Sequence, residues 1–258
     1  MNGITRIAIV GPGRVANHLA PAFKEKGIEI TGIYGRDADD TAKLARKVEA
    51  PVIQDIGKRI NADLILLCVS DDSIGEISAQ LSSSNKAIVA HTSGAVPMSA
   101  IPESLRRGVF YPLQSFSADK NIVWDNVPFC IEAEHDEDVN LLGSVAEKLS
   151  NKIYILSSEQ RKSLHLAAVF ANNFANLMFE FSEELLEKAD IDRSILHPLI
   201  LETANKVLMQ RASESQTGPA SRGDVETIRA HRELLGEDNT YRTIYDILTQ
   251  EIYDRNHH

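Results

Sequence analysis

The chain has 258 residues, of which 43% are hydrophobic and 25% charged, and its formal net charge is −10. This composition excludes a disordered chain, a collagen-like repeat and a coiled-coil rod, and the length suffices for one large or two modest domains. The acidic balance argues against non-specific nucleic-acid binding. No apolar run reaches the roughly 18 residues of a membrane helix, and the first residues lack the pattern of a signal peptide. We therefore expect a cytoplasmic protein with neither a nucleic-acid nor a membrane partner.

Short apolar runs alternate with helical patterns over the first part of the chain. The predicted strands are 4–10, 29–34, 52–53, 64–69, 87–91, 108–111, 129–132 and 152–156, and the predicted helices are 13–26, 39–48, 73–81 and 137–149. Such alternation is typical of a parallel, doubly wound sheet with right-handed crossovers. We predict an α/β domain over residues 1–156.

The pattern changes after residue 156, because only helical periodicity follows. The predicted helices are 159–189, 195–211, 224–235 and 240–253. We predict an all-helical domain over residues 157–258. Its segment 163–181 is apolar on nearly all sides, which is typical of a buried helix. Because one small domain offers little to cover it, we expect a homodimer formed through the C-terminal helices.

A glycine-rich segment follows the first predicted strand and opens the first predicted helix. It fits the G-x-G-x-x-G/A fingerprint, with Gly11 allowing a tight turn, Gly13 a close approach to a pyrophosphate and Ala16 close helix–sheet packing. This context predicts a Rossmann-like, dinucleotide-binding domain, and the alternative is a glycine turn without a ligand. The residues expected to bind the cofactor here are Gly11, Pro12, Gly13, Arg14 and Val15.

The end of the second strand distinguishes NAD from NADP, since an acidic residue there binds the ribose hydroxyls of NAD. Here the strand ends in Tyr34-Gly35-Arg36-Asp37. Arg36 offers a planar guanidinium to a 2′-phosphate, and Asp37 is placed to cap the next helix. We therefore predict NADP in preference to NAD. A solvated surface arginine is the alternative for Arg36.

Two serines follow strands at the edge of the sheet where ligands bind in such folds. Ser70 follows the predicted strand 64–69, and Ser93 follows the predicted strand 87–91. We expect Ser70 to line the cofactor and Ser93 to contact the nicotinamide or the substrate. A strand-to-helix turn capped by Ser93 is the alternative.

Polar side chains interrupt the apolar helix 163–181. His165, Asn172 and Asn176 fall close together around the helix, with Lys162 about 60° away. Buried polar groups need partners, so these residues line a ligand cleft between the domains or form an internal hydrogen-bond network. In the first case His165, Lys162 and Asn172 are the catalytic candidates, with His165 as the proton donor, and Asn176 binds substrate.

Two loops complete the set of candidate substrate residues. Gln114 and Ser115 lie in the segment 111–116, which we expect to approach the substrate from the sheet. Arg222 lies in the loop 217–224 and offers a bidentate guanidinium to a carboxylate or phosphate. The terminal pair of histidines is too short for a metal site, and we expect no metal.

The quoted segments resemble a group of bacterial two-domain proteins. They are GPGRVANHLA near the start, HTSGA, YPLQSF, KSLHLAAVFANNF, and TGPASRGD with IRAH downstream. The resemblance covers almost the whole chain. It implies a Rossmann-like domain followed by a helical domain of unknown function, in proteins labelled NADP oxidoreductases of the deazaflavin-dependent type. Their layout is similar to that of pyrroline-carboxylate reductases and β-hydroxyacid dehydrogenases.

This sequence departs from those patterns at two positions. Tyr111 stands where the group usually has histidine. The β-hydroxyacid dehydrogenases place an asparagine one helical turn after a lysine, whereas here Leu166 follows Lys162 at that spacing. The resemblance therefore indicates the fold and the cofactor more strongly than it indicates the substrate.

Two functions remain open from the sequence. The first is an NADP-dependent oxidoreductase that transfers a hydride between the nicotinamide and a carbonyl or imine carbon of a small polar metabolite; the residues do not specify whether a deazaflavin takes part. The second is a dinucleotide-binding regulatory or scaffolding protein without turnover. A pocket that joins His165 to the nicotinamide end of the cofactor would favour the enzyme.

Overall fold

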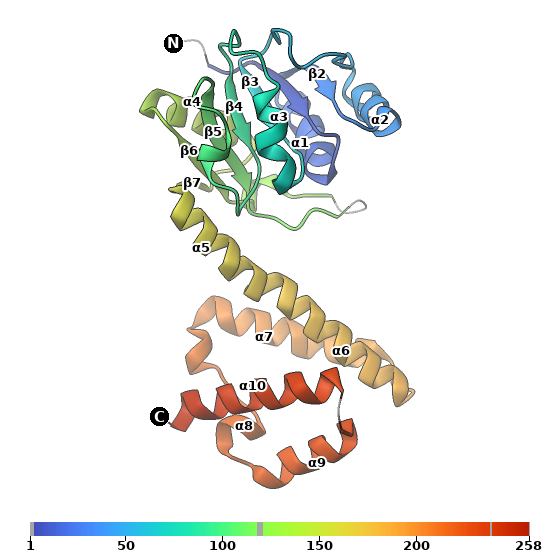
Figure 1. The fold of residues 1–258 in the computed structure, drawn as a ribbon. Helices are drawn as coiled ribbons and strands as arrows, with labels where there is room; N and C mark the ends of the chain where they lie inside the picture. Colours follow the sequence, from blue (N-terminus) through green and yellow to red (C-terminus); the bar gives the residue numbers. More distant parts are fainter. Residues whose placement is uncertain (1–2, 118–120, 238, 258) are drawn as a thin grey trace. The chain divides into compact units, whose positions relative to one another are not determined.

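A computed structural model describes residues 3–117, 121–237 and 239–257 (Figure 1). The chain divides into two compact units between Val169 and Phe170. The boundary predicted at residue 156 precedes helix α5 (Ser158–Ala168), which belongs to the first unit. No helix of the described chain combines the length and apolar character needed to cross a membrane.

The first unit is built on a seven-stranded sheet with the order β2-β1-β3-β4-β5-β6-β7. Its strands are β1 (Arg6–Val10), β2 (Glu29–Tyr34), β3 (Leu64–Leu67), β4 (Ile88–His91), β5 (Arg106–Pro112), β6 (Phe129–Ala133) and β7 (Ile153–Ile155). All neighbouring strands are parallel except β5 and β6, which are antiparallel. The predicted doubly wound sheet is thus confirmed, with one antiparallel pair in addition. The predicted strand at 52–53 is reduced to a single bridge between Ile33 and Val52.

Helices cover both faces of this sheet (Figure 1). They are α1 (Arg14–Glu25), α2 (Ala38–Val48), α3 (Ile74–Ala79) and α4 (Asp136–Glu147), whereas α5 follows β7 and extends away from the sheet. Ile7 and Ile9 of β1 share a buried cluster with residues of α1, α2 and α4. Ala8 and Val10 share another with residues of α3. Because the central strands are buried on both sides, their sequences are almost entirely apolar, with Arg6 at the start of β1 and His91 at the end of β4 as exceptions.

The regular secondary structure in the described part of the second unit is all helical. It contains α6 (Ala175–Lys188), α7 (His197–Met209), α8 (Pro219–Arg222), α9 (Val225–Leu235) and α10 (Thr240–His257), and a π-helical turn, Val169–Phe174, joins α5 to α6. The predicted continuous helix 159–189 is therefore α5, the π turn and α6. The segment 163–181 was expected to be a buried helix. Within one chain, however, α6 has no buried residue.

Candidate functional site

The glycine-rich turn between β1 and α1 is shaped by close backbone contacts. Gly11 has a φ of 100°, and a Cβ atom there would lie 2.5 Å from the carbonyl oxygen of Cys68, so only glycine fits. Gly13 is the N-cap of α1, and no side chain caps that helix. The N–H groups of its first turn are therefore not capped by a side chain at the Gly13 position, and uncapped helix ends of this kind suit an anion.

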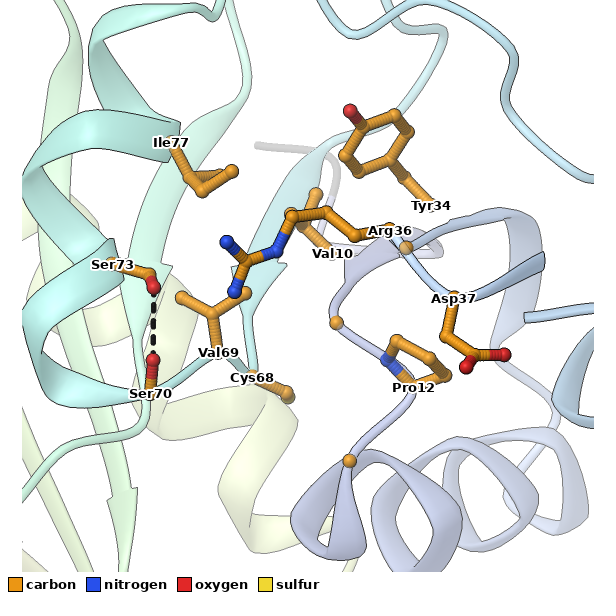
Figure 2. A pocket seen from close by; sticks show the side chains of 13 residues that line it. Val10, Pro12, Tyr34, Arg36, Asp37, Cys68, Val69, Ser70, Ser73 and Ile77 are labelled. Atoms are coloured by element: carbon orange, nitrogen blue, oxygen red, sulfur yellow. Dashed lines mark hydrogen bonds between the residues drawn. The ribbon is translucent and has the colours of Figure 1, made fainter. Parts of the chain in front are cut away.

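A pocket of about 320 Å³ lies over this turn (Figure 2). This is within the size range of small-molecule sites. It brings together five of the eight predicted cofactor residues, namely Gly11, Pro12, Gly13, Arg36 and Ser70. Arg14 and Val15 belong to the adjoining first turn of α1 and are not among the lining residues.

Arg36 and Asp37 are neighbours that point in different directions. The Arg36 guanidinium extends across the pocket toward Val69 and Ser70 (Figure 2). The Asp37 carboxylate instead caps α2, accepting a hydrogen bond of 2.9 Å from the backbone N–H of Asp40. The acidic group at the end of β2 is thus committed to the helix, while the cationic group faces the pocket.

A second group of residues lies where α5 meets β5 and the turn after β4. The Tyr111 hydroxyl is 3.3 Å from Nδ1 of His165, and the two rings meet edge-on. A Cβ atom on Gly94 would lie 2.6 Å from the same Nδ1, so the imidazole rests against the backbone of Gly94. Burial raises the pKa of Tyr111 to about 12, which keeps its hydroxyl protonated.

Arg161 fixes α5 to the turn on which His165 rests. It is fully buried, and its Nη1 donates to the carbonyl oxygens of Ser93, Gly94 and Val96 at 3.2, 3.2 and 2.8 Å. Its Nη2 donates to the carboxylate of Glu132 at 3.0 Å. Arg161 was not among the residues predicted from the sequence. Its spacing of four from His165, which puts both on one face of a helix, was the available signal.

Ser93 takes part in the same turn through its own side chain. Its hydroxyl accepts hydrogen bonds from the backbone N–H groups of Ala95 and Val96 at 3.1 and 3.0 Å. These contacts match the turn-capping alternative for this residue, and a contact with nicotinamide or substrate stays a prediction.

The remaining predicted residues are exposed and fall into two sets. In the first unit, Lys162 forms an ion pair of 3.1 Å with Glu159, and the Gln114 side chain accepts from the backbone N–H of Ser115. Asn172, Asn176 and Arg222 belong to the second unit. The structure therefore brings His165 together with Tyr111 and Gly94, while the roles of the other candidates stay predictions.

Two family models match the chain. A Rossmann-like domain matches residues 3–113, and a domain of unknown function, DUF2520, matches residues 127–252. A protein from Bacteroides fragilis with a solved crystal structure, described as a "putative NADP oxidoreductase", has 37% sequence identity to this chain. The two structures match with a TM-score of 0.87, over 97% of this chain and 98% of that chain. A comparison with curated proteins found no match.

Two more distant structures show the fold alone. A protein from Thermotoga maritima is 22% identical with a TM-score of 0.73, over 97% of this chain and 98% of that chain. A pyrroline-5-carboxylate reductase from Coxiella burnetii is 16% identical with a TM-score of 0.59, over 99% of this chain and 98% of that chain.

These findings define first the class and then the family of the protein. The sheet topology and the glycine-rich turn make it a Rossmann-fold protein. The chain belongs to the family that joins a Rossmann-like domain to a DUF2520 helical domain, as the resemblance in its motifs predicted.

Proposed function

We propose that the protein is an NADP-dependent oxidoreductase that reduces a carbonyl or imine carbon of a small polar metabolite. The observation that carries this proposal is the Arg36 guanidinium in the pocket over the glycine-rich turn, beside an Asp37 that is committed to capping α2. A guanidinium suits a 2′-phosphate, whereas a free carboxylate would suit the ribose hydroxyls of NAD.

The residues of the pocket fit NADP on three counts. The uncapped first turn of α1 supplies backbone donors for the pyrophosphate. Gly11 and Gly13 carry no side chain that would obstruct its approach. Arg36 has no acidic partner among the described residues, so its charge is available for the 2′-phosphate. The description of the Bacteroides fragilis relative agrees with this choice of cofactor.

NADPH would supply the hydride, and this chain would supply the proton and the positioning. When the substrate carbon receives the hydride, the electron pair of its double bond moves to the oxygen or nitrogen. His165 carrying a hydrogen on both nitrogens then gives the one on Nε2 to that atom. The neutral ring that remains holds its hydrogen on Nδ1 and returns to the tautomer with hydrogen on Nε2 by exchange with water before the next turnover. Lys162 and Arg222 stay our candidates for charge stabilisation and for holding an anionic substrate group.

Calorimetric titration of NADPH and NADH tests the choice of cofactor. We expect NADPH to bind more tightly by about 2 kcal/mol, or about 30-fold, because a charge-assisted phosphate contact has this scale. In Arg36→Ala the preference should disappear. The matched control is Arg46→Ala, which removes an exposed arginine from the last turn of α2 and should keep the preference. Equal affinities in the wild type, or a preference that survives in Arg36→Ala, would refute the role of Arg36.

A further inference from the structure

We infer that Tyr111 is a positioning residue: it holds neutral His165 in the tautomer that carries its hydrogen on Nε2. In this arrangement the Nε2–H donor faces away from Tyr111 and is available to an oxygen or nitrogen atom of the substrate. The substrate role rests on the proposed function, whereas the tautomer is a property of this chain alone.

The direction of the hydrogen bond follows from the burial of Tyr111. Its hydroxyl has one hydrogen-bond partner among the described residues, Nδ1 of His165 at 3.3 Å. A buried hydroxyl hydrogen needs an acceptor, and Nδ1 accepts only when it carries no hydrogen of its own. The hydrogen of the neutral ring must then lie on Nε2. The raised pKa of Tyr111, about 12, keeps the phenol in its donating form.

Two neighbours limit the movement of the ring. The imidazole rests against Gly94, where any Cβ atom would come within 2.6 Å of Nδ1. Arg161, one turn earlier on α5, binds three carbonyl oxygens of the turn that contains Gly94. The ring is half-buried, and Nε2 has no hydrogen-bond partner within the described part of the first unit.

The tautomer determines what neutral His165 can do. With a hydrogen on Nε2, the ring donates a hydrogen bond to the substrate atom that gains negative charge during hydride transfer. Without it, Nε2 would accept a proton and act as a base. Tyr111 therefore makes His165 a donor, in keeping with a site that reduces its substrate.

Nitrogen-15 NMR of the full-length protein without cofactor tests the inference, because protonated and unprotonated imidazole nitrogens differ in chemical shift. The pH is raised until the His165 resonances stop changing, so that only the neutral ring is observed. We expect one dominant tautomer in the wild type, with Nε2 protonated and Nδ1 unprotonated. In Tyr111→Phe, which keeps the aromatic ring and removes the hydroxyl, the two nitrogen shifts should converge as the tautomers mix.

A matched control and a second variant separate positioning from a general loss of structure. Tyr245→Phe removes the hydroxyl that lies 2.9 Å from Nδ1 of His231 and should leave the His165 tautomer unchanged. Gly94→Ala should displace the imidazole and, like Tyr111→Phe, mix the tautomers. A wild-type His165 protonated on Nδ1, or an unchanged tautomer in Tyr111→Phe, would overturn the inference. Failure to bind NADPH with the tautomer result intact would count against the proposed function alone.

Discussion

At the scale of single residues, His91 shows how burial near the site affects the protein's response to pH. It is fully buried at the end of β4, where its Nδ1 accepts a hydrogen bond of 3.2 Å from the backbone N–H of Ser93. Burial, and then the charge of Arg161, lower its pKa to about 4 from an ordinary value of 6.5. The folded protein therefore holds His91 neutral at pH values where the unfolded chain would protonate it.

This difference predicts a loss of stability in mild acid. The unfolded state binds more protons between about pH 6.5 and pH 4, so His91 lowers the free energy of unfolding as the pH falls through that range, by about 3 kcal/mol in total. His91→Asn retains an acceptor for Ser93 and removes the titration. Urea unfolding of both proteins from pH 7 to pH 4 should show the wild type losing stability relative to the variant. Parallel curves would mean that His91 is not held neutral.

The candidate site was predictable from the sequence where its residues are close in the chain. Gly11, Gly13 and Arg36 belong to a local pattern whose geometry a strand and a helix impose, and the structure places them in one pocket. The contact between Tyr111 and His165 spans 54 positions and depends on how α5 packs on β5. No local pattern encodes such a contact, so His165 and the segment 111–116 were each expected at the site from their chemistry, while their direct contact was not predicted.

At the scale of elements, α5 is attached to the sheet through one buried ion pair. Arg161 links the first turn of α5 to Glu132 of β6 and to the turn after β4. Both partners of the pair are shielded from water, since their side chains are 1% and 15% exposed. The arrangement explains how His165, on the next turn of the same helix, is held over Gly94.

Replacing Arg161 should therefore destabilise the first unit strongly. Arg161→Met removes the cationic partner of the Glu132 carboxylate, which keeps only its hydrogen bonds from Ser158, and removes the donor to three carbonyl oxygens. We expect a loss of about 3 kcal/mol or more in the free energy of unfolding. Arg107→Met is the comparison, because its acidic partners Glu103 and Glu134 are exposed; it should lose clearly less. Similar losses in chemical denaturation would show that the Arg161 contacts are not a principal attachment of α5.

The order and type of the elements were largely predictable, because apolar runs of four to eight residues between helical patterns mark parallel strands. The antiparallel pairing of β5 and β6 was not predicted. In its described part, the connection between them holds only the short 3₁₀ turn Trp124–Asn126, whereas a parallel crossover usually contains a helix. Strand periodicity carries no information about direction, so only the length and content of the connection could have indicated it.

At the scale of the whole molecule, the second unit exposes a large apolar surface. The described residues of α6, α7, α9 and α10 include none that is buried. Leu208, Met209 and Leu234 are 81%, 87% and 84% exposed. So many large apolar side chains exposed on one small helical unit are unusual for a soluble monomer. We propose that a second copy of the chain covers it, in a symmetric homodimer formed through the helices of this unit.

Light scattering at micromolar concentration tests the association. We expect a mass twice the 28.5 kDa of one chain. Leu208→Asp places a charge in the exposed surface of α7 and should raise the dimer dissociation constant at least about tenfold, the effect of roughly 1.4 kcal/mol. Arg211→Asp, a change at a polar position just beyond α7, serves as the control. A monomeric wild type would contradict the proposal.

We propose that NADP binds over the glycine-rich turn with its 2′-phosphate held by Arg36, and a crystal structure of the NADP⁺ complex would show this binding mode directly. We expect the pyrophosphate against the first turn of α1, the 2′-phosphate within hydrogen-bond distance of the Arg36 guanidinium, and His165 within about 8 Å of the nicotinamide, a distance that one bridging water can span. A dinucleotide bound elsewhere, or a 2′-phosphate that does not touch Arg36, would contradict this binding mode.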